Sequence, residues 1–105
     1  MFVNVIKSYR DVVAACDSEL LGRKFEEPFG DAVKQLDVKE NFYKGKEGRE
    51  VSEEELVELM KFFAREDATF NIVGEKSVNA ALKAGIVSEE NIGTVQGVPF
   101  LLVLL

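Results

Sequence analysis

Hydrophobic and polar residues alternate at the start of the chain, in the stretch "FVNVIK". Most of its apolar residues are β-branched or aromatic, and alternation of this kind favours a β-strand. The following residues, "SYRD", are typical of a turn, and "VVAAC" (12–16) again reads as a strand. The opening of the chain therefore predicts a β-hairpin.

Four predicted helix starts share one arrangement, in which an apolar residue precedes a capping residue and a second apolar residue follows the first by five positions. This arrangement is the hydrophobic staple. The fullest example is Val51-Ser52 with Leu56, because Glu55 adds a capping box. The other three starts lie at Asp17, Gly74 and Ser88, and we expect the first and last of these to support only one or two turns.

Two of these starts open the main predicted helices. The helix from Ser52 should run to about Arg65, because its apolar residues repeat at helical spacing and share one face. The helix from Gly74 should be shorter, because Gly85 is a natural C-terminal stop. The residues expected to face the core are Leu56, Leu59, Met60 and Phe63 in the first helix, and Val78, Ala81 and Leu82 in the second.

The remaining segments are mostly strand-like. "LDVKENFY" (36–43) alternates and predicts a strand, while "TFNIV" (69–73) fits either a strand or the end of the preceding helix. "IGTVQ" and "FLLVLL" are further strands, separated by a bend at Gly97 and Pro99. The stretch "PFLLVLL" lacks polar alternation, so we expect it either to be buried on both faces as a central strand or to contact another chain, at a homodimer interface or with a larger partner.

Strands and helices in mixed order predict an α+β fold. We expect a two-layer sandwich in which a mostly antiparallel sheet is covered on one face by the two main helices, with short helical turns besides. The chain has 105 residues and shows neither repeats nor a linker. It is therefore expected to form a single domain over residues 1–105.

Composition narrows the possible functions. The chain contains no histidine and one cysteine, which excludes histidine-based nucleophile systems and the usual zinc and iron–sulfur sites. Its 19 acidic and 13 basic residues give a net charge of −6, so broad nucleic-acid binding and sequence-specific DNA binding are not expected. The single cysteine and the lack of a signal peptide or membrane-spanning run predict a cytoplasmic protein.

The motif "GEKS" (74–77) resembles part of a phosphate-binding P-loop. It fails that pattern twice, because Glu75 separates Gly74 from Lys76 and because Thr69 stands where the first glycine belongs. One weaker hypothesis remains, in which the amides of Glu75, Lys76 and Ser77 hold an anion at the helix start. The alternative is that Gly74 simply gives the backbone freedom at a helix cap.

Three other groups of residues are candidates for chemistry. Lys44, Lys46 and Arg49 lie beside Tyr43 and its neighbour Phe42, and aromatic rings next to cations contact RNA in other proteins, although acidic neighbours dilute the charge. Cys16 is either a reactive thiol or a small buried residue, and its acidic neighbour Asp17 favours burial. The run of glutamates from Glu53 to Glu58 is either a hard-metal site or, more commonly, a solvated helix face. We name no catalytic residue, metal or cofactor.

Three stretches together resemble a known family: "AACDSELLGRKF", "FYKG" and "NIVGEKSVNAALKAGIVSEENI…GVP". In this order they are similar to the archaeal family catalogued as domain of unknown function 424. The resemblance implies an archaeal cytoplasmic protein with a two-layer sandwich, no established activity and an association with translation components. It points to Gly74, Glu75, Lys76, Gly97 and Pro99 as positions of interest, and the segment "EPFGDAVKQ" is longer here than the family pattern.

Two functional hypotheses follow. The first is a noncatalytic interaction module that serves a protein or ribonucleoprotein partner in translation or other information processing. The second is a protein that binds a small molecule or anion at Gly74–Ser77, with weak carboxylate-based enzymology as its catalytic variant.

Overall fold

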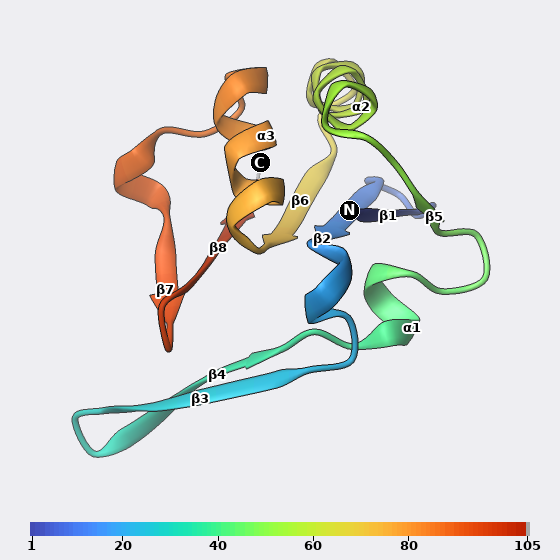
Figure 1. The fold of residues 1–105 in the computed structure, drawn as a ribbon. Coiled ribbons are helices and arrows are strands. Elements are labelled where there is room, and N and C mark those ends of the chain that lie inside the picture. The colour runs from blue at the N-terminus through green and yellow to red at the C-terminus, as the bar shows by residue number, and fades with distance from the viewer. Residues whose placement is uncertain (105) are drawn as a thin grey trace.

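The computed structural model describes residues 1–104 and shows one mixed sheet with elements packed on both faces (Figure 1). The alternating residues at the start of the chain form strand β1 (Phe2–Ile6), and the returning strand is β2 (Val12–Cys16). The two strands pair antiparallel, with Phe2 opposite Cys16. The predicted opening hairpin is confirmed.

The central sheet has the strand order β5-β1-β2-β6-β8-β7. Strand β6 (Thr69–Val73), the segment that fitted either a strand or a helix end, pairs parallel with β2. Strand β8 (Val98–Val103) pairs antiparallel with both β6 and β7 (Gly93–Val95), and β5 (Arg49–Glu50) pairs antiparallel with β1 at the opposite edge. One parallel pair among antiparallel ones confirms a mostly antiparallel sheet.

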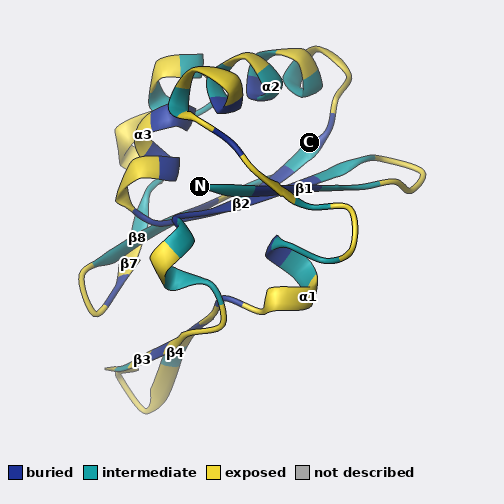
Figure 2. Ribbon diagram, turned by 45° about the vertical axis from the view of Figure 1, so that its right-hand side comes forward, coloured by how far each residue is buried: buried dark blue, intermediate teal, exposed yellow. Residues whose placement is uncertain are grey.

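The two main helices cover one face of this sheet (Figure 2). Helix α2 (Glu53–Arg65) begins with the predicted capping box, in which the side chains and backbone amides of Ser52 and Glu55 satisfy one another. Helix α3 (Glu75–Ala84) ends at Gly85, which adopts a left-handed conformation. The core beneath the helices contains the buried side chains of Val13, Leu56, Met60, Phe70, Ile72 and Leu101. The predicted α+β class is confirmed, and none of the helices in residues 1–104 is long and apolar enough to cross a membrane.

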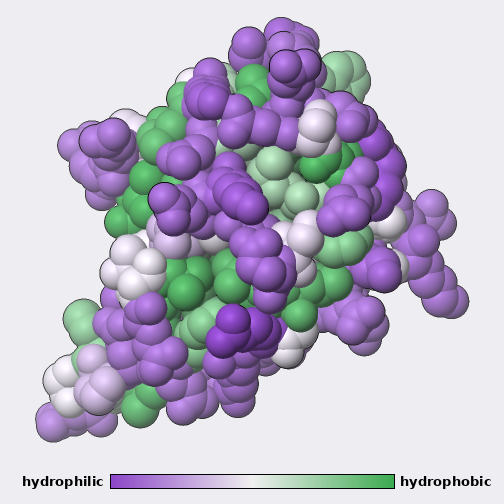
Figure 3. Space-filling model, viewed as in Figure 1, coloured by the Kyte–Doolittle hydropathy of each residue, from purple (hydrophilic) through white to green (hydrophobic). Residues whose placement is uncertain are grey.

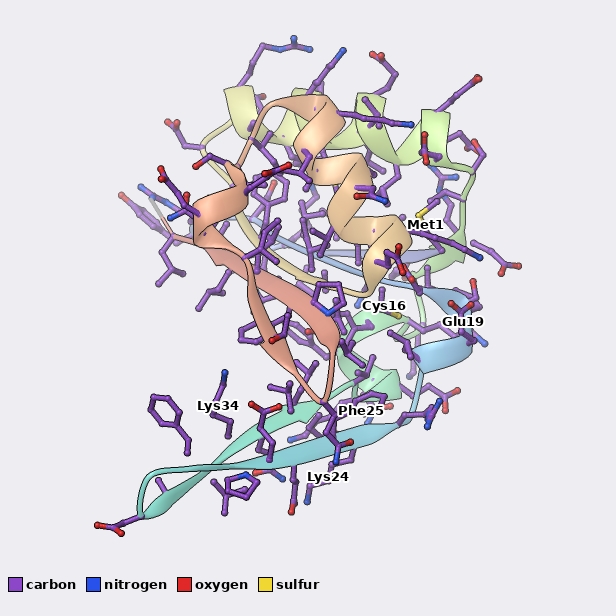
Figure 4. All side chains as sticks on the ribbon, turned by 60° about the vertical axis from the view of Figure 1, so that its left-hand side comes forward. Met1, Cys16, Glu19, Lys24, Phe25 and Lys34 are labelled. Atoms are coloured by element: carbon purple, nitrogen blue, oxygen red, sulfur yellow. The ribbon has the colours of Figure 1, made fainter. Side chains whose placement is uncertain are left out.

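The second face of the sheet carries a hairpin that the sequence did not predict. Strands β3 (Lys24–Phe29) and β4 (Ala32–Asp37) form a separate two-stranded sheet, and a short helix α1 (Glu40–Tyr43) follows. Phe25, Leu36, Val38 and Tyr43 pack there against Cys16 and other side chains of the central sheet. The sheet is therefore covered on both faces, and Figure 4 shows Phe25 between the hairpin and the body of the protein.

The prediction of one strand over residues 36–43 is wrong. Strand β4 ends at Asp37, because its pairing partner β3 begins at Lys24, which lies opposite that residue. The amide of Val38 then donates to the carbonyl of Arg23 at 2.9 Å, and the chain turns into α1. The alternation in this segment reflects two elements with different partners.

Strand β8 lies between β6 and β7, as expected of a central strand, but within this chain it is not buried on both faces. Leu101 faces the helices and is 2% exposed, whereas its neighbour Leu102 is 54% exposed on the second face. The cover on that face is formed by the hairpin and α1, and it does not extend over Leu102. The bend before this strand is a tight turn at Gln96 and Gly97, which both have positive φ, while Pro99 lies within β8 itself.

The two remaining helix starts give one turn each. Residues Ser18–Leu20 form the 3-10 turn η1, and Glu89–Asn91 form η2. Both agree with the expected length of one or two turns. Asp17, however, makes no side-chain cap to η1, because its carboxylate serves a different helix.

Candidate functional site

The start of helix α3 is occupied by a carboxylate of the protein itself. Asp17, which is buried, accepts hydrogen bonds from the amide of Lys76 at 3.1 Å and from the amide of Ser77 at 2.8 Å. The hydroxyl of Ser77 donates to the same carboxylate at 2.8 Å. Asp17 therefore caps α3 across a separation of about 60 residues and places a negative charge at the positive end of that helix.

Gly74 makes this contact possible. Its backbone has φ 107° and ψ 152°, a region that is essentially restricted to glycine. A Cβ atom at this position would lie only 2.4 Å from the carboxyl carbon of Asp17. The glycine of "GEKS" is therefore needed both for its backbone conformation and for the close approach of Asp17.

Strand pairing brings the parts of this site together. Strands β2 and β6 run parallel, so that Asp17 and Gly74 follow the same end of neighbouring strands. The amide of Asp17 donates to the carbonyl of Val73 at 3.1 Å, and the amide of Gly74 donates to the carbonyl of Pro99 at 2.8 Å. Of the positions suggested by the family resemblance, Gly74 and Pro99 thus meet, whereas Gly97 lies in the exposed turn between β7 and β8.

This arrangement bears directly on the anion-binding hypothesis. The amides of Lys76 and Ser77, which were to hold an external anion, already bind Asp17. The side chains of Glu75 and Lys76 are exposed, and Ser77 is buried beneath the cap. A second anion at this helix end would have to displace or approach a buried carboxylate, which electrostatic repulsion opposes. The geometry is that of a structural cap.

The proposed nucleic-acid loop does not present its residues together. Tyr43 is buried in the second core cluster, and Arg49 pairs with Glu55 at 3.1 Å. Lys44 lies over the ring of Phe2, with its Nζ 5.4 Å from the ring centroid. Lys46 is exposed, but the ring of Tyr43 is not accessible and Phe42 is half-buried against the same cluster.

Cys16 and Tyr43 lie in the same apolar cluster and are both kept neutral. Burial, followed by the nearby charge of Asp17, raises the pKa of Cys16 from 9.0 to about 12. Burial also raises the pKa of Tyr43 from 10.0 to about 12, with smaller contributions from Cys16 and Asp37. A thiol with a raised pKa and no exposed surface is a poor nucleophile, so the geometry favours the packing role for Cys16.

The glutamate run is distributed over several local contacts. Glu53 bonds to Lys83, and Glu55 completes the capping box and pairs with Arg49. These contacts, with the backbone of Ser52 foremost, lower the pKa of Glu55. Within residues 1–104, no three carboxylate or thiol side chains are grouped in a way that could hold a metal ion.

Sequence reasoning missed Asp17 as the main polar residue of the site. It identified Asp17 as a helix cap, but assigned it to the helix that follows it in the sequence. The available signal was that Asp17 and Gly74 each follow a strand-like segment, "VVAAC" and "TFNIV". Parallel pairing of those segments would have predicted the contact.

Comparison with known proteins identifies a relationship but no activity. A model of the family described as "Protein of unknown function (DUF424)" matches residues 6–105. The crystal structure of an uncharacterized conserved protein from the archaeon Methanopyrus kandleri is similar, with a TM-score of 0.77 and 26% sequence identity. The similarity covers 97% of this chain and 88% of that chain. Among curated proteins, none matches.

Proposed function

This chain belongs to the DUF424 family, whose description states no activity, and we propose that it is a noncatalytic interaction module that binds a protein partner through the β3–β4 hairpin. We call this hairpin, residues 24–37, the arm. The proposal depends mainly on one observation, which is that the arm carries large apolar side chains into solvent.

The arm is firmly attached to the body at its base. Phe25 and Leu36 lie opposite each other in the hairpin and are buried in the second core cluster. Further along, Glu27 accepts a hydrogen bond from the amide of Gln96 at 2.5 Å, and Lys34 donates to the carbonyl of Thr94 at 2.9 Å. These contacts with the β7–β8 hairpin give the arm a defined direction, which preorganises its outer part for binding.

The outer part of the arm has no apolar cover. Phe29 is 65% exposed and Val33 is 62% exposed, on either side of the turn at Gly30 and Asp31. Green apolar atoms on this part of the surface are visible in Figure 3, where the arm extends away from the helices. Within residues 1–104, each of its strands pairs only with the other, so both outer edges present backbone groups that a further strand could bind. Exposed apolar side chains beside unpaired strand edges are typical of protein-binding surfaces.

The charge of the arm favours a protein over RNA. Residues 24–37 contain two basic and four acidic side chains, which would repel a phosphate backbone. A partner with an apolar groove and a basic rim would complement both the aromatic tip and the acidic flanks. A protein of the translation apparatus, alone or as part of a ribonucleoprotein, is the partner we propose to test first.

The proposal is tested by comparing the proteins that bind to the wild-type chain with those that bind to its variants. The wild-type protein, immobilised, is exposed to an extract of its source organism, and the bound proteins are identified by mass spectrometry. We expect the double variant Phe29→Ser/Val33→Ser to lose the specific partner while the free energy of unfolding stays within about 0.5 kcal/mol. The matched control is Phe62→Ser, which changes an aromatic residue on α2 that is 51% exposed.

The decisive measurement is the affinity for the identified partner in purified form. Loss of binding by at least about tenfold in the arm variant, but not in Phe62→Ser, supports the arm as the interface. Equal affinity of both variants would refute it. Capture that disappears on treatment with ribonuclease would instead identify RNA as the ligand.

A further inference from the structure

A cavity of about 330 Å³ lies on the face of the sheet opposite the arm. It opens between the C-terminal half of α2 and the residues that follow α3. Its apolar lining comes from two helices, two strands and the segment after α3, and consists of Ala64, Phe70, Ala84, Ile86 and Val103. This volume is within the range that proteins use for small ligands, which bind in mostly apolar pockets with a few polar groups.

The cavity exists because small residues stand where the two helices approach each other. Ala64 and Ala84 provide only methyl groups, and Gly85 provides no side chain at all. A Cβ atom built on Gly85 would meet nothing within 4 Å. Larger side chains at these positions would extend into this space.

Two cations complete the lining. Lys61 and Arg65 are one helical turn apart on α2, at positions i and i+4, and both line the cavity. The Nζ atom of Lys61 forms an ion pair with Glu58 at 3.7 Å. Arg65 forms no ion pair with any residue in the part of the chain that is described. Each can stabilise the C-terminal end of α2, but that role does not occupy their hydrogen-bond donors.

We propose that this cavity binds a small monocarboxylate with an apolar body, such as a short fatty acid or an aryl carboxylate. The apolar part would pack against Phe70, Ile86 and Val103, and the carboxylate would pair with Arg65 and Lys61. An arginine fork matches carboxylate geometry, and a charge-assisted bond beside an apolar wall is stronger than one in open water. A phosphate or a sugar would leave the apolar lining unused, and a neutral hydrocarbon would leave the two cations unused.

Octanoate is a suitable probe, because it combines one carboxylate with a flexible apolar chain. Titration into the full chain, followed by amide NMR, should give saturable shifts at Ala64, Ala84 and Gly85, with a dissociation constant below about 1 mM. Two further compounds with the same chain length as octanoate separate the contribution of the carboxylate from that of the apolar chain. Both 1-octanol and octylammonium should bind at least about tenfold more weakly than octanoate, because they lack the negative charge.

Substitutions at Lys61 and Arg65 test whether these two residues bind the carboxylate. Arg65→Gln and Lys61→Gln should each weaken octanoate binding by about tenfold without changing the affinity for 1-octanol. Lys46→Gln removes an equal charge from an exposed loop position and should bind octanoate as the wild type does. Circular dichroism on each variant confirms that it is folded.

Several outcomes would overturn the proposal. These are the absence of shifts at up to about 10 mM octanoate, shifts confined to other parts of the molecule, equal binding of octanoate and 1-octanol, or unchanged binding in the double variant Lys61→Gln/Arg65→Gln. None of these results depends on the arm, so this inference and the proposed function can fail separately.

Discussion

Gly74 and Asp17 together explain the structural role of the "GEKS" motif. The "GEKS" stretch begins a helix whose amides need an acceptor, and a carboxylate from a distant strand end supplies it. The glycine is required because any side chain would meet that carboxylate. A motif that resembles a phosphate loop in sequence is thus, in the structure, an internally capped helix.

At this scale we predict that Gly74→Ala is strongly destabilising. The substitution forces a residue with a Cβ into a backbone region reserved for glycine and against Asp17, at a cost of about 3 kcal/mol. Urea unfolding of the purified variant measures the loss. Gly97→Ala is the matched control, because Gly97 also has positive φ but a Cβ there would meet nothing within 4 Å. The control should lose only about 1 kcal/mol, and equal losses would show that the contact with Asp17 does not matter.

A second residue-scale prediction concerns the cap itself. Asp17→Asn keeps the size of the side chain but replaces one acceptor oxygen by a donor, which would face either the amide of Lys76 or the amide and hydroxyl of Ser77. We expect the free energy of unfolding to fall by about 2 kcal/mol in chemical denaturation. Asp31→Asn, in the exposed arm turn, and Lys76→Ala, at an exposed side chain, should each change it by less than about 0.5 kcal/mol. A stable Asp17→Asn protein would mean that the cap contributes little.

Among the elements, α2 is the one whose local sequence was most informative. Its capping residues and apolar stripe lie within 14 consecutive residues, from Ser52 to Arg65, and both appear as predicted. Helix capping and helical periodicity are local properties, so they can be read without knowledge of the fold. The hairpin formed by β3 and β4 lacks such local signals, because most of its side chains are exposed.

For α2 we predict a moderate effect of removing its cap. Ser52→Ala should lower the free energy of unfolding by about 1 kcal/mol, because the amide of Glu55 loses its acceptor. Thermal unfolding by circular dichroism is sufficient to detect this. Ser88→Ala is the control, because the side chain of Ser88 precedes η2 without capping it. If the control is equally destabilised, the loss cannot be assigned to capping.

On the scale of the whole molecule, the central sheet separates two apolar clusters, and each cluster lies next to a different proposed binding region. The helix-covered cluster borders the cavity, and the other cluster anchors the arm. Both proposed binding regions are thus built on one rigid sheet but lie on opposite faces. Binding at one need not obstruct binding at the other.

The buried Cys16 and Tyr43 give the whole molecule a predicted alkaline instability. Their pKa values are raised on folding, so the unfolded chain loses these protons at lower pH than the folded chain does. Stability should therefore be fully present below about pH 9 and should decline as the pH rises toward 12. Urea unfolding over this interval should show a shallower decline in the double variant Cys16→Ala/Tyr43→Phe. An equally steep decline would place the instability in other groups.

The sequence by itself determined the two main helices, most of the central strands and the α+β class, because caps, staples and alternation act between residues close together in the chain. It also excluded histidine-dependent chemistry through composition alone. Only the tertiary structure decided that β2 and β6 pair in parallel, that Asp17 caps α3 and that the base of the arm packs with α1 on the second face. Those outcomes depend on contacts between residues far apart in the chain, for which local periodicity contains no information.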